Sequence, residues 1–435
     1  MSRLLLGCIA DDFTGATDLA NNLVRSGMRV VQAIGVPRVP LADDVDAVVV
    51  ALKSRTIAPA DVIARSLAAL EWLRAQGAGQ IYFKYCSTFD STAHGNIGPV
   101  TEALMEALGT DFTIACPAFP ENKRTVFKGY LFAGEVPLNE SGMQNHPLTP
   151  MTDANLVRVL QSQATRKVGL VDYTVVAQGP AAITRRIAAL RAEGVSIAIV
   201  DAISDADLLR LGPALESFAL VTAGSGVAIG LPQNWGIAPT PTAAQLPPAT
   251  GQRVVISGSC SVATRGQVEA FIAAGGRAHA IDPAALGEGK DQVREAVAWA
   301  RESMPHGPVL VYSTAEPDAV RAVQQRYGMQ ASGERVEAAL ASIAVELAAL
   351  GARQFVVAGG ETSGAVVQAL GVETLRIGPQ IDPGVPWCAA HSPVANAAVH
   401  LALKSGNFGT PDFFSKAFAR LEPAAGTAAA LHAHG

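Results

Sequence analysis

The sequence predicts a protein of two α/β domains, each a mostly parallel sheet flanked by helices, and three observations lead to this fold class. The chain has 435 residues, which exceeds what one hydrophobic core usually organises. Apolar residues make up 49% of the chain and charged residues only 16%, as in well-buried layers of helices and strands. Short apolar runs alternate with helical patterns, and this alternation is typical of parallel strands joined by helices.

Composition also argues against several classes of protein. The formal net charge is −5 and Lys and Arg form no cluster, so we expect no nucleic-acid partner. No apolar run approaches the roughly 20 residues that cross a bilayer, so we expect no association with a membrane. The five cysteines are scattered without metal-ligand spacing, which favours a reducing, cytoplasmic setting. The oligomeric state stays open, and a homo-oligomer is compatible with this composition.

The first predicted domain covers residues 1–236 and opens with an apolar run over residues 4–10. This run predicts a buried strand, and it stops at two adjacent carboxylates, Asp11 and Asp12. A tight turn and a helix ending near Gly27 follow. In open α/β sheets, ligands bind at this carboxyl end of a strand. The alternative is that the two acids only cap the helix.

Further strands and helices of the first domain are predicted by the same patterns. The strands lie at residues 29–34, 45–51, 80–84, 112–116, 168–171, 197–201 and 219–222, and the helices at residues 60–76, 100–108, 154–163 and 181–193. The segment 117–150 interrupts the alternation. A segment of that length inside a compact domain is usually functional or forms a small hairpin.

Polar side chains gather where these strands end and in the loops that follow. One by one, they are as well explained as solvated charges. Together they occupy positions where ligand-binding residues concentrate, and cations for a carboxylate with acids for hydroxyls suit a polyhydroxy acid. Besides the two adjacent acids, the candidates are Arg55, Lys84, Asp90, Ser91, Asn96, Arg124 and His146.

Residues 237–251 are predicted to link the two domains, because prolines recur there and charges are absent. The second domain then covers residues 252–422, and residues 423–435 form a flexible tail. The strands of the second domain are predicted at residues 253–257, 278–281, 309–313, 355–358 and 374–377. Its helices are predicted at residues 262–274, 292–303, 334–350, 364–370 and 413–421.

Two loops of the second domain predict an anion site. Each follows a strand, is rich in glycine and hydroxyl groups and precedes a helix, so backbone N–H groups and the helix dipole favour an anion there. The candidate contacts are Ser257 and Ser259 in one loop, and Gly359, Gly360, Glu361, Thr362, Ser363 and Gly364 in the other. An acidic site in one half and anion loops in the other suit a transferase with two substrates.

Other well-known phosphate and cofactor motifs are absent from the sequence. No G-x-x-x-x-G-K-[ST] loop and no G-x-S-x-G elbow occurs. A glycine-rich turn at residues 224–230 resembles a dinucleotide-binding turn. No Asp or Glu lies between Glu216 and Glu269 to bind a ribose, however, so an NAD site is not favoured.

Five motifs together resemble the four-carbon acid sugar kinases: ADDFTGATDLA, KYCSTFDSTAHGNIG, NHPLTPMTDANL, ISGSCSVAT and GGETSGAVVQALG. The resemblance covers nearly the whole chain. It implies an N-terminal domain for the acid sugar, a C-terminal domain for ATP, and phosphorylation of the C4 hydroxyl. A 3-oxo-tetronate is the expected substrate, with D-threonate or D-erythronate as alternatives. At matching positions it implies ATP contacts at Ser259, residues 359–362 and Gly406, and sugar-acid contacts at Asp12, Arg55, Lys84 and Asp90.

Phosphoryl transfer needs alignment, charge neutralisation and an oriented nucleophile rather than covalent help from the protein. We expect Asp12 to accept the proton of the C4 hydroxyl, with Asp11 or Asp90 as the alternative base. Glu361 is the expected Mg²⁺ ligand, directly or through water. The active site is expected in a cleft between the domains that closes to exclude water. A sensor that binds the acid without turnover is the remote alternative.

Overall fold

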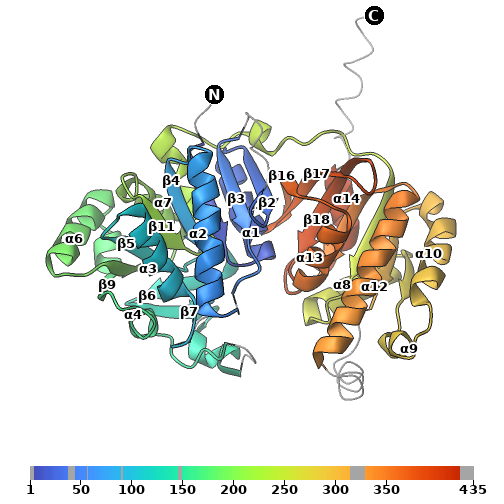
Figure 1. The fold of residues 1–435 in the computed structure, drawn as a ribbon, viewed down its shortest axis with the longest axis horizontal. Coiled ribbons are helices and arrows are strands. Elements are labelled where there is room, and N and C mark those ends of the chain that lie inside the picture. The colour runs from blue at the N-terminus through green and yellow to red at the C-terminus, as the bar shows by residue number, and fades with distance from the viewer. Residues whose placement is uncertain are drawn as a thin grey trace, which may run out of the picture. The chain divides into compact units, whose positions relative to one another are not determined.

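The structure is a computed structural model that describes residues 4–37, 45–55, 57–89, 92–145, 149–313 and 329–421. The predicted site residues Asp90, Ser91 and His146, and the predicted tail 423–435, lie outside the described residues. The chain divides into two compact units, Met1–Gln245 and Leu246–Gly435 (Figure 1). Each unit has its own sheet and its own covering helices.

The first unit contains a parallel sheet with the strand order β2-β3-β1-β4-β11-β5-β10-β9. Its strands are β1 Leu6–Ala10, β2 Val30–Ile34, β3 Ala47–Ala51, β4 Gln80–Lys84, β5 Thr113–Cys116, β9 Val168–Val171, β10 Ile197–Val200 and β11 Leu220–Ala223. Its helices are α1 Phe13–Arg25, α2 Pro59–Ala75, α3 Ile97–Leu108, α4 Leu156–Gln161, α5 Tyr173–Val176, α6 Pro180–Ala192 and α7 Asp205–Ala214.

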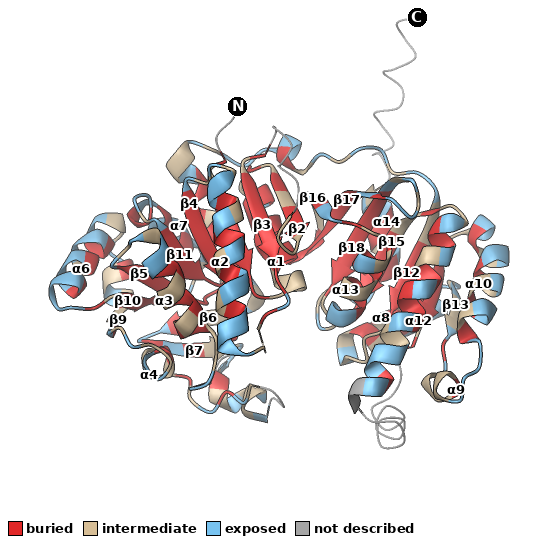
Figure 2. Cartoon of the chain, in the orientation of Figure 1, coloured by how far each residue is buried: buried red, intermediate tan, exposed pale blue. Residues whose placement is uncertain are grey.

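Strands β1, β3 and β4 are buried along their whole length (Figure 2). Neighbouring strands pair with both edges of β1 and helices cover the sheet, so these strands read as continuous apolar runs rather than alternating ones. Ala10 at the end of β1 is paired with Ala51 of β3 and with Lys84 of β4. The three strands therefore end side by side, and the residues that follow them are neighbours.

Residues 117–145 of the long predicted segment form a small antiparallel sheet with flanking turns. Its strands are β6 Arg124–Phe127, β7 Tyr130–Ala133 and β8 Val136–Pro137, in that spatial order. The buried carboxylate of Asp201, just after β10, accepts backbone N–H groups of Lys128 at 2.6 Å, Gly129 at 2.8 Å and Tyr173 at 2.8 Å. The turn of the hairpin is thereby fastened to the carboxyl edge of the large sheet.

The second unit contains a mixed sheet with the strand order β13-β14-β12-β15-β18-β17-β16. The first five strands in this order are parallel, whereas β18, β17 and β16 pair antiparallel. The strands are β12 Gln252–Ser257, β13 Arg277–Ala280, β14 Val309–Tyr312, β15 Ala352–Ala358, β16 Thr374–Asp382, β17 Val385–Ser392 and β18 Ala397–Lys404. The helices are α8 Val262–Ala273, α9 Pro283–Gly287, α10 Gln292–Ser303, α12 Met329–Ala349, α13 Gly360–Ala369 and α14 Phe413–Leu421.

Sequence patterns did not predict β17 and β18, although both are largely buried. Their core is shared with α14, whose aromatic residues Phe413, Phe414 and Phe418 pack in one cluster with Trp387 of β17. The indole N–H of Trp387 donates to the carbonyl of Ala417 at 2.7 Å, so its polar group is satisfied inside the core. None of the helices in the described ranges is long and apolar enough to cross a membrane.

Candidate active site

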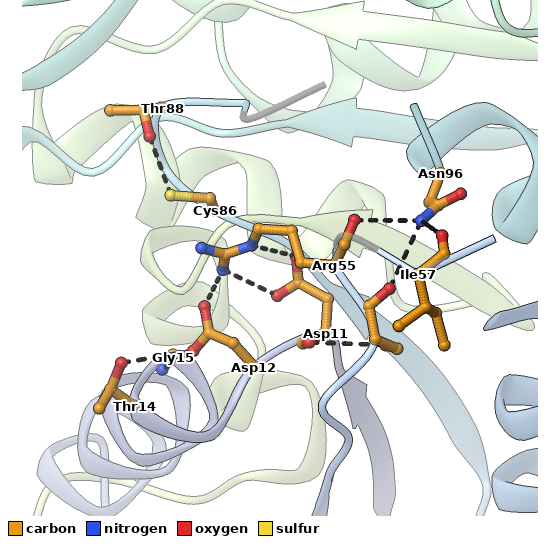
Figure 3. Close-up of polar contacts among 10 residues, drawn as sticks. Asp11, Asp12, Thr14, Gly15, Arg55, Ile57, Cys86, Thr88 and Asn96 are labelled. Carbon is orange, nitrogen blue, oxygen red and sulfur yellow. Dashed lines mark hydrogen bonds and ion pairs between the residues drawn. The ribbon is translucent and has the colours of Figure 1, made fainter. Parts of the chain in front are cut away.

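The two acids after β1 are held together by Arg55, which follows β3 (Figure 3). The Arg55 Nε donates to Asp11 Oδ2 at 2.8 Å, and its Nη2 donates to Asp11 Oδ1 at 3.1 Å and also to Asp12 Oδ2. Two adjacent carboxylates would otherwise repel each other, and the shared guanidinium offsets that repulsion. The side chain of Asp12 is 28% exposed and that of Asp11 only 9%. Asp12 is therefore the more accessible of the two acids.

Asp12 also caps helix α1. Its backbone is extended and its Oδ1 accepts the backbone N–H of Gly15, with the hydroxyl of Thr14 at 3.4 Å. The capping interpretation of this acid is therefore structurally correct. The second oxygen, Oδ2, accepts from Arg55, so both oxygens have partners in the protein while the side chain stays 28% exposed.

Asn96, predicted as a substrate contact, supports the loop that carries Arg55. Its Nδ2 donates to the carbonyls of Arg55 and Ile57, each at 3.0 Å (Figure 3). The Oδ1 of the same amide is buried without a hydrogen-bond partner. These contacts hold the backbone of Arg55 in place from the side of α3, which begins at Ile97.

Lys84, the last residue of β4, carries a buried ammonium. The residue is 3% exposed, and a Cβ atom built on Gly15 would lie 1.8 Å from its Nζ. Gly15 thus makes room for the lysine directly beside the cap of α1. Within the described part of the chain, Lys84 has no hydrogen-bond or ion-pair partner for this group. The charge of Lys84 interacts with that of the buried Asp18 but has no directly paired anion, so an anionic ligand would fit this site as a direct partner.

Asp18 on α1 is a buried acid that sequence reasoning did not single out. The Ser225 hydroxyl donates to its Oδ2, and its Oδ1 has no partner. Burial raises the pKa of Asp18 to about 6, while the Ser225 hydrogen bond and the Lys84 charge act in the opposite direction. Asp18 and Asn22 are four residues apart and lie on the same buried face of α1. Two polar residues at this spacing, on the face of a helix that packs against a sheet, are the sequence pattern that could have indicated a buried polar group.

Arg124, another predicted substrate contact, lies at the start of β6. Its Nη1 donates to the carbonyls of Asn122 at 2.9 Å and Lys123 at 3.4 Å. Among the described residues, no hydrogen bond or ion pair joins it to the cluster of Asp11, Asp12 and Arg55. The structure thus brings together the two acids, Arg55, Lys84 and Asn96, and places Arg124 on a separate element.

In the second unit, the loops after three neighbouring parallel strands meet. Ser257 of β12 is paired with Ala358 of β15, which in turn is paired with Lys404 of β18, so these strands end together. A Cβ atom on Gly258 would lie 2.2 Å from the Thr362 hydroxyl oxygen. The loops can approach this closely because glycine has no side chain.

The remaining contacts among these loops are equally tight. Gly359 has φ +123°, and a Cβ atom there would lie 2.9 Å from the Thr362 hydroxyl oxygen. A Cβ atom on Gly406 would lie 2.5 Å from the Ser259 hydroxyl oxygen. The three loops therefore form one continuous cradle of backbone and small hydroxyl groups, at the carboxyl edge where α/β sheets bind ligands.

The other predicted nucleotide contacts differ in accessibility. Ser257 and Ser363 are fully buried, whereas Glu361 is exposed in the first turn of α13. Gly360 is the first residue of that helix, and Gly364 has open space around it. No group of three or more His, Cys, Asp or Glu side chains placed to hold a metal ion occurs among the described residues. Glu361 therefore stands as a single carboxylate, which suits Mg²⁺ that is held mainly by phosphates and water.

Family models match both units. Residues 6–231 match the sugar-binding N-terminal domain, and residues 254–414 match the nucleotide-binding C-terminal domain. The chain therefore belongs to the four-carbon acid sugar kinase family, and the resemblance seen in its motifs is confirmed. It is an enzyme of the kinase class, a phosphotransferase with an alcohol as acceptor.

Individual relatives match over nearly their whole lengths. A Burkholderia multivorans protein named 3-oxo-tetronate kinase is 60% identical over 428 residues, which are 98% of this chain and 99% of its own. A Pseudomonas fluorescens protein of the same name is 59% identical, covering 96% of this chain and 97% of its own. The crystal structure of a Salmonella typhimurium LT2 protein described as a tRNA synthase has a TM-score of 0.88 and 44% identity, covering 96% of this chain and 100% of that one.

Proposed function

We propose that this kinase uses ATP to phosphorylate the C4 hydroxyl of 3-oxo-tetronate, giving ADP and 3-oxo-tetronate 4-phosphate. The observation that carries the proposal is the buried Lys84 ammonium beside the accessible Asp12 carboxylate, both adjacent to Gly15. A cation without a partner suits the carboxylate of the acid, and an accessible acid suits its hydroxyl. The 60% identity to a protein named for this substrate supports the choice of acid.

Asp12 is the proposed general base. As the C4 oxygen forms its bond to the γ-phosphorus and the bond from phosphorus to the bridging oxygen of ADP breaks, the hydroxyl proton passes to Asp12. A positioned carboxylate contributes roughly 10²–10⁴ in rate. Arg55 holds this acid in place. Asp11 is the weaker candidate because its side chain is less exposed than that of Asp12. Asp90 stays an alternative outside the described residues.

The cradle formed by Gly258, Gly359 and Gly406 is the proposed nucleotide site. A Cβ atom on any of these glycines would meet the hydroxyl oxygen of Thr362 or Ser259, so the loops pack closely, and their backbone and hydroxyl groups suit phosphate oxygens. ATP supplies the phosphoryl group when bound, and Mg²⁺ neutralises its charge. Glu361 is the residue proposed to hold the metal, directly or through water.

A substrate panel with coupled detection of ADP tests this function. We expect kcat/KM to be at least tenfold higher for 3-oxo-tetronate than for D-threonate or D-erythronate. The reverse order would make one of those acids the substrate. Binding of the acid without ADP release would instead indicate a sensor. A role on tRNA, as the description of the Salmonella protein suggests, is not favoured by a net charge of −5.

The proposed role of Lys84 predicts a selective defect. Lys84→Met should raise the KM for the acid at least tenfold and leave the KM for ATP nearly unchanged, because only the acid loses a charge-assisted contact. Lys53→Met removes an exposed lysine of the same unit and serves as the control. The neutral four-carbon ketose should be a poor substrate of the unmodified enzyme. Equal rates with the acid and the neutral sugar would contradict the assignment.

A further inference from the structure

The loop after β18 is held by hydrogen bonds from one polar face of helix α8. Ser261 Oγ and Thr264 Oγ1 both donate to the carbonyl of Gly406, at 2.6 and 2.8 Å. The buried amide of Gln267 donates to the carbonyls of Phe408, Gly409 and Thr410 at 3.0–3.1 Å. Because these side chains are spaced three residues apart, they lie on one face of the helix. The loop and the start of α8 form a single block.

Lys404, the last residue of β18, lies inside this block. The residue is fully buried, and its Nζ donates to Thr264 Oγ1 at 2.9 Å and to the carbonyls of Ser405 at 3.1 Å and Gly406 at 3.0 Å. All three N–H donors of an ammonium are therefore used. The backbone carbonyl of the same residue accepts the N–H of Gly359 in the neighbouring loop, at 2.9 Å. Lys404 thus joins helix α8 to the loops after β15 and β18.

The charge of Lys404 has no ion-pair partner in the part of the chain that the structure describes. Its acceptors are a hydroxyl on α8 and two backbone carbonyls, and within the described ranges no carboxylate forms an ion pair with it. The acids next to this loop, Asp382 and Asp412, are paired with Lys416. Glu361 at the start of α13 is exposed. Burial lowers the pKa of Lys404 to about 7, because the charged form is poorly solvated there.

We propose that Lys404 is a positioning residue of the nucleotide site. It holds the Gly406 loop against α8, and its buried positive charge stabilises the bound phosphates. The proposal rests on the proposed function, in which the cradle binds ATP. Lys404 has no exposed surface and acts on the nucleotide through the loop and through its charge. The phosphates supply the missing anion, so a bound nucleotide favours the protonated lysine.

This role predicts that ATP binding takes up a proton. Near pH 8 the free lysine is mostly neutral, and the phosphates above it favour the ammonium, so binding and protonation are linked. Calorimetric titration with Mg-ATP at pH 8, in two buffers of different ionisation enthalpy, measures the protons taken up. We expect uptake approaching one proton in the unmodified enzyme and in Lys290→Met, an exposed lysine of the same unit. No uptake by the unmodified enzyme would overturn the proposal without any variant of Lys404.

Lys404→Met should abolish the uptake, weaken ATP binding at least tenfold, and raise the KM for ATP more than it lowers kcat. Binding of the acid should be unchanged. If ATP binding needs Gly258 but is unaffected by Lys404→Met, the inference about Lys404 is wrong and the nucleotide site stands. If ATP binding is unaffected by Gly258→Ala as well, the proposed nucleotide site fails and this inference fails with it.

Discussion

Arg55 serves two carboxylates in this structure, and its charge is thereby compensated inside the protein. It binds Asp11 through both oxygens and reaches Asp12 with the same Nη2 atom. Lys84 is different, because no described residue forms a direct ion pair with it, although its charge acts on the pKa of the buried Asp18. The structure therefore separates two cations that the sequence had placed in one role. Arg55 holds the two acids together, and Lys84 is the cation that we propose for the carboxylate of a substrate.

The double role of Asp12 leads to a test that separates capping from catalysis. Asp12→Asn keeps the size and the acceptor that caps α1 but removes basicity, so kcat should fall by two orders of magnitude or more. The melting temperature should change little, because Asn is as good a cap as Asp. ATP binding should be retained, since the cradle belongs to the other unit.

Asp12→Ala is the companion variant, which loses the cap as well and should lower stability by about 1 kcal/mol. Both properties are measured on the same purified samples. A variant that turns over at nearly the normal rate, whatever its melting temperature, would move the role of base to another acid, with Asp90 first in line.

The raised pKa of Asp18 predicts a pH dependence of stability. Because its folded-state pKa is about 6 and the ordinary value is lower, the folded protein binds this proton more tightly than the unfolded chain. The contribution of protonated Asp18 to the stability of the folded protein is complete below the ordinary pKa of aspartate, and it is lost as the pH rises through 6. Asp18→Asn cannot ionise, so its stability relative to the unmodified enzyme should improve between pH 4.5 and 7, by about 2 kcal/mol.

Melting curves at several pH values measure this difference. Asp111→Asn is the matched control, because Arg191 lowers the pKa of this exposed acid and the expected trend is small and opposite in sign. Parallel pH profiles for Asp18→Asn and the unmodified enzyme would show that Asp18 does not titrate as its burial predicts.

At the scale of elements, both proposed sites depend on helices that begin directly after a strand. Helix α1 begins with the Asp12 cap, α8 with the Ser261 cap and α13 with the strained Gly359. The positive end of each helix dipole lies at the carboxyl edge of its sheet, where it favours negative charge. In the first unit the strand ends supply acids and a lysine, whereas in the second they supply glycines and hydroxyls. The same local design therefore serves two different ligands.

The close packing of the three loops predicts that Gly258→Ala disrupts the cradle. The added methyl group would meet the Thr362 hydroxyl at 2.2 Å, so the loops after β12 and β15 must separate. We expect ATP affinity to fall at least tenfold, with binding of the acid retained. Calorimetric titration with each ligand measures both effects.

Gly266→Ala is the control for this change, because it introduces the same methyl group into open space on α8. It should leave ATP binding unchanged and stabilise the helix by roughly 0.5–1 kcal/mol. If both alanine variants bind ATP equally well, the contact between Gly258 and Thr362 has no part in the nucleotide site.

At the scale of the whole molecule, each unit has its own sheet and core. The proposed connecting segment 237–251 is largely exposed and holds no strand or α-helix. Ligands that bind different units should therefore stabilise them separately. The placement of the active site between the two units stays a prediction from the sequence.

Limited proteolysis tests this division. The segment is largely exposed and contains no lysine or arginine, so a protease of broad specificity such as subtilisin is suitable, and trypsin is the control that should not cut there. We expect an early cut in the segment that releases fragments close to the two units. Mg-ATP should then slow further digestion of the C-terminal fragment, and the sugar acid that of the N-terminal fragment. Protection of both fragments by each ligand alone would contradict separate binding sites.

Local patterns in the sequence were sufficient for the elements whose signals are short-range. The apolar run before Asp11 and Asp12 predicted β1, and the acids and turn residues predicted the start of α1, because strand burial and helix capping depend on neighbours in the chain. The glycine and hydroxyl loops of the second half were recognised for the same reason. The long motifs also placed the chain in its family.

Tertiary structure alone decided which of these pieces meet. Arg55 lies 43 residues from Asp12 in the chain, and Ser225 lies 207 residues from Asp18, yet each pair is hydrogen-bonded. The order of strands in the sheet brings them together, and local composition does not encode that order. Lys404 carried the same signal as Lys84, a lysine that ends a buried strand. Sequence patterns predicted neither β18 nor its neighbour β17, and the long-range pairing of Lys404 with Ala358 of β15 places the lysine among the loops of the cradle.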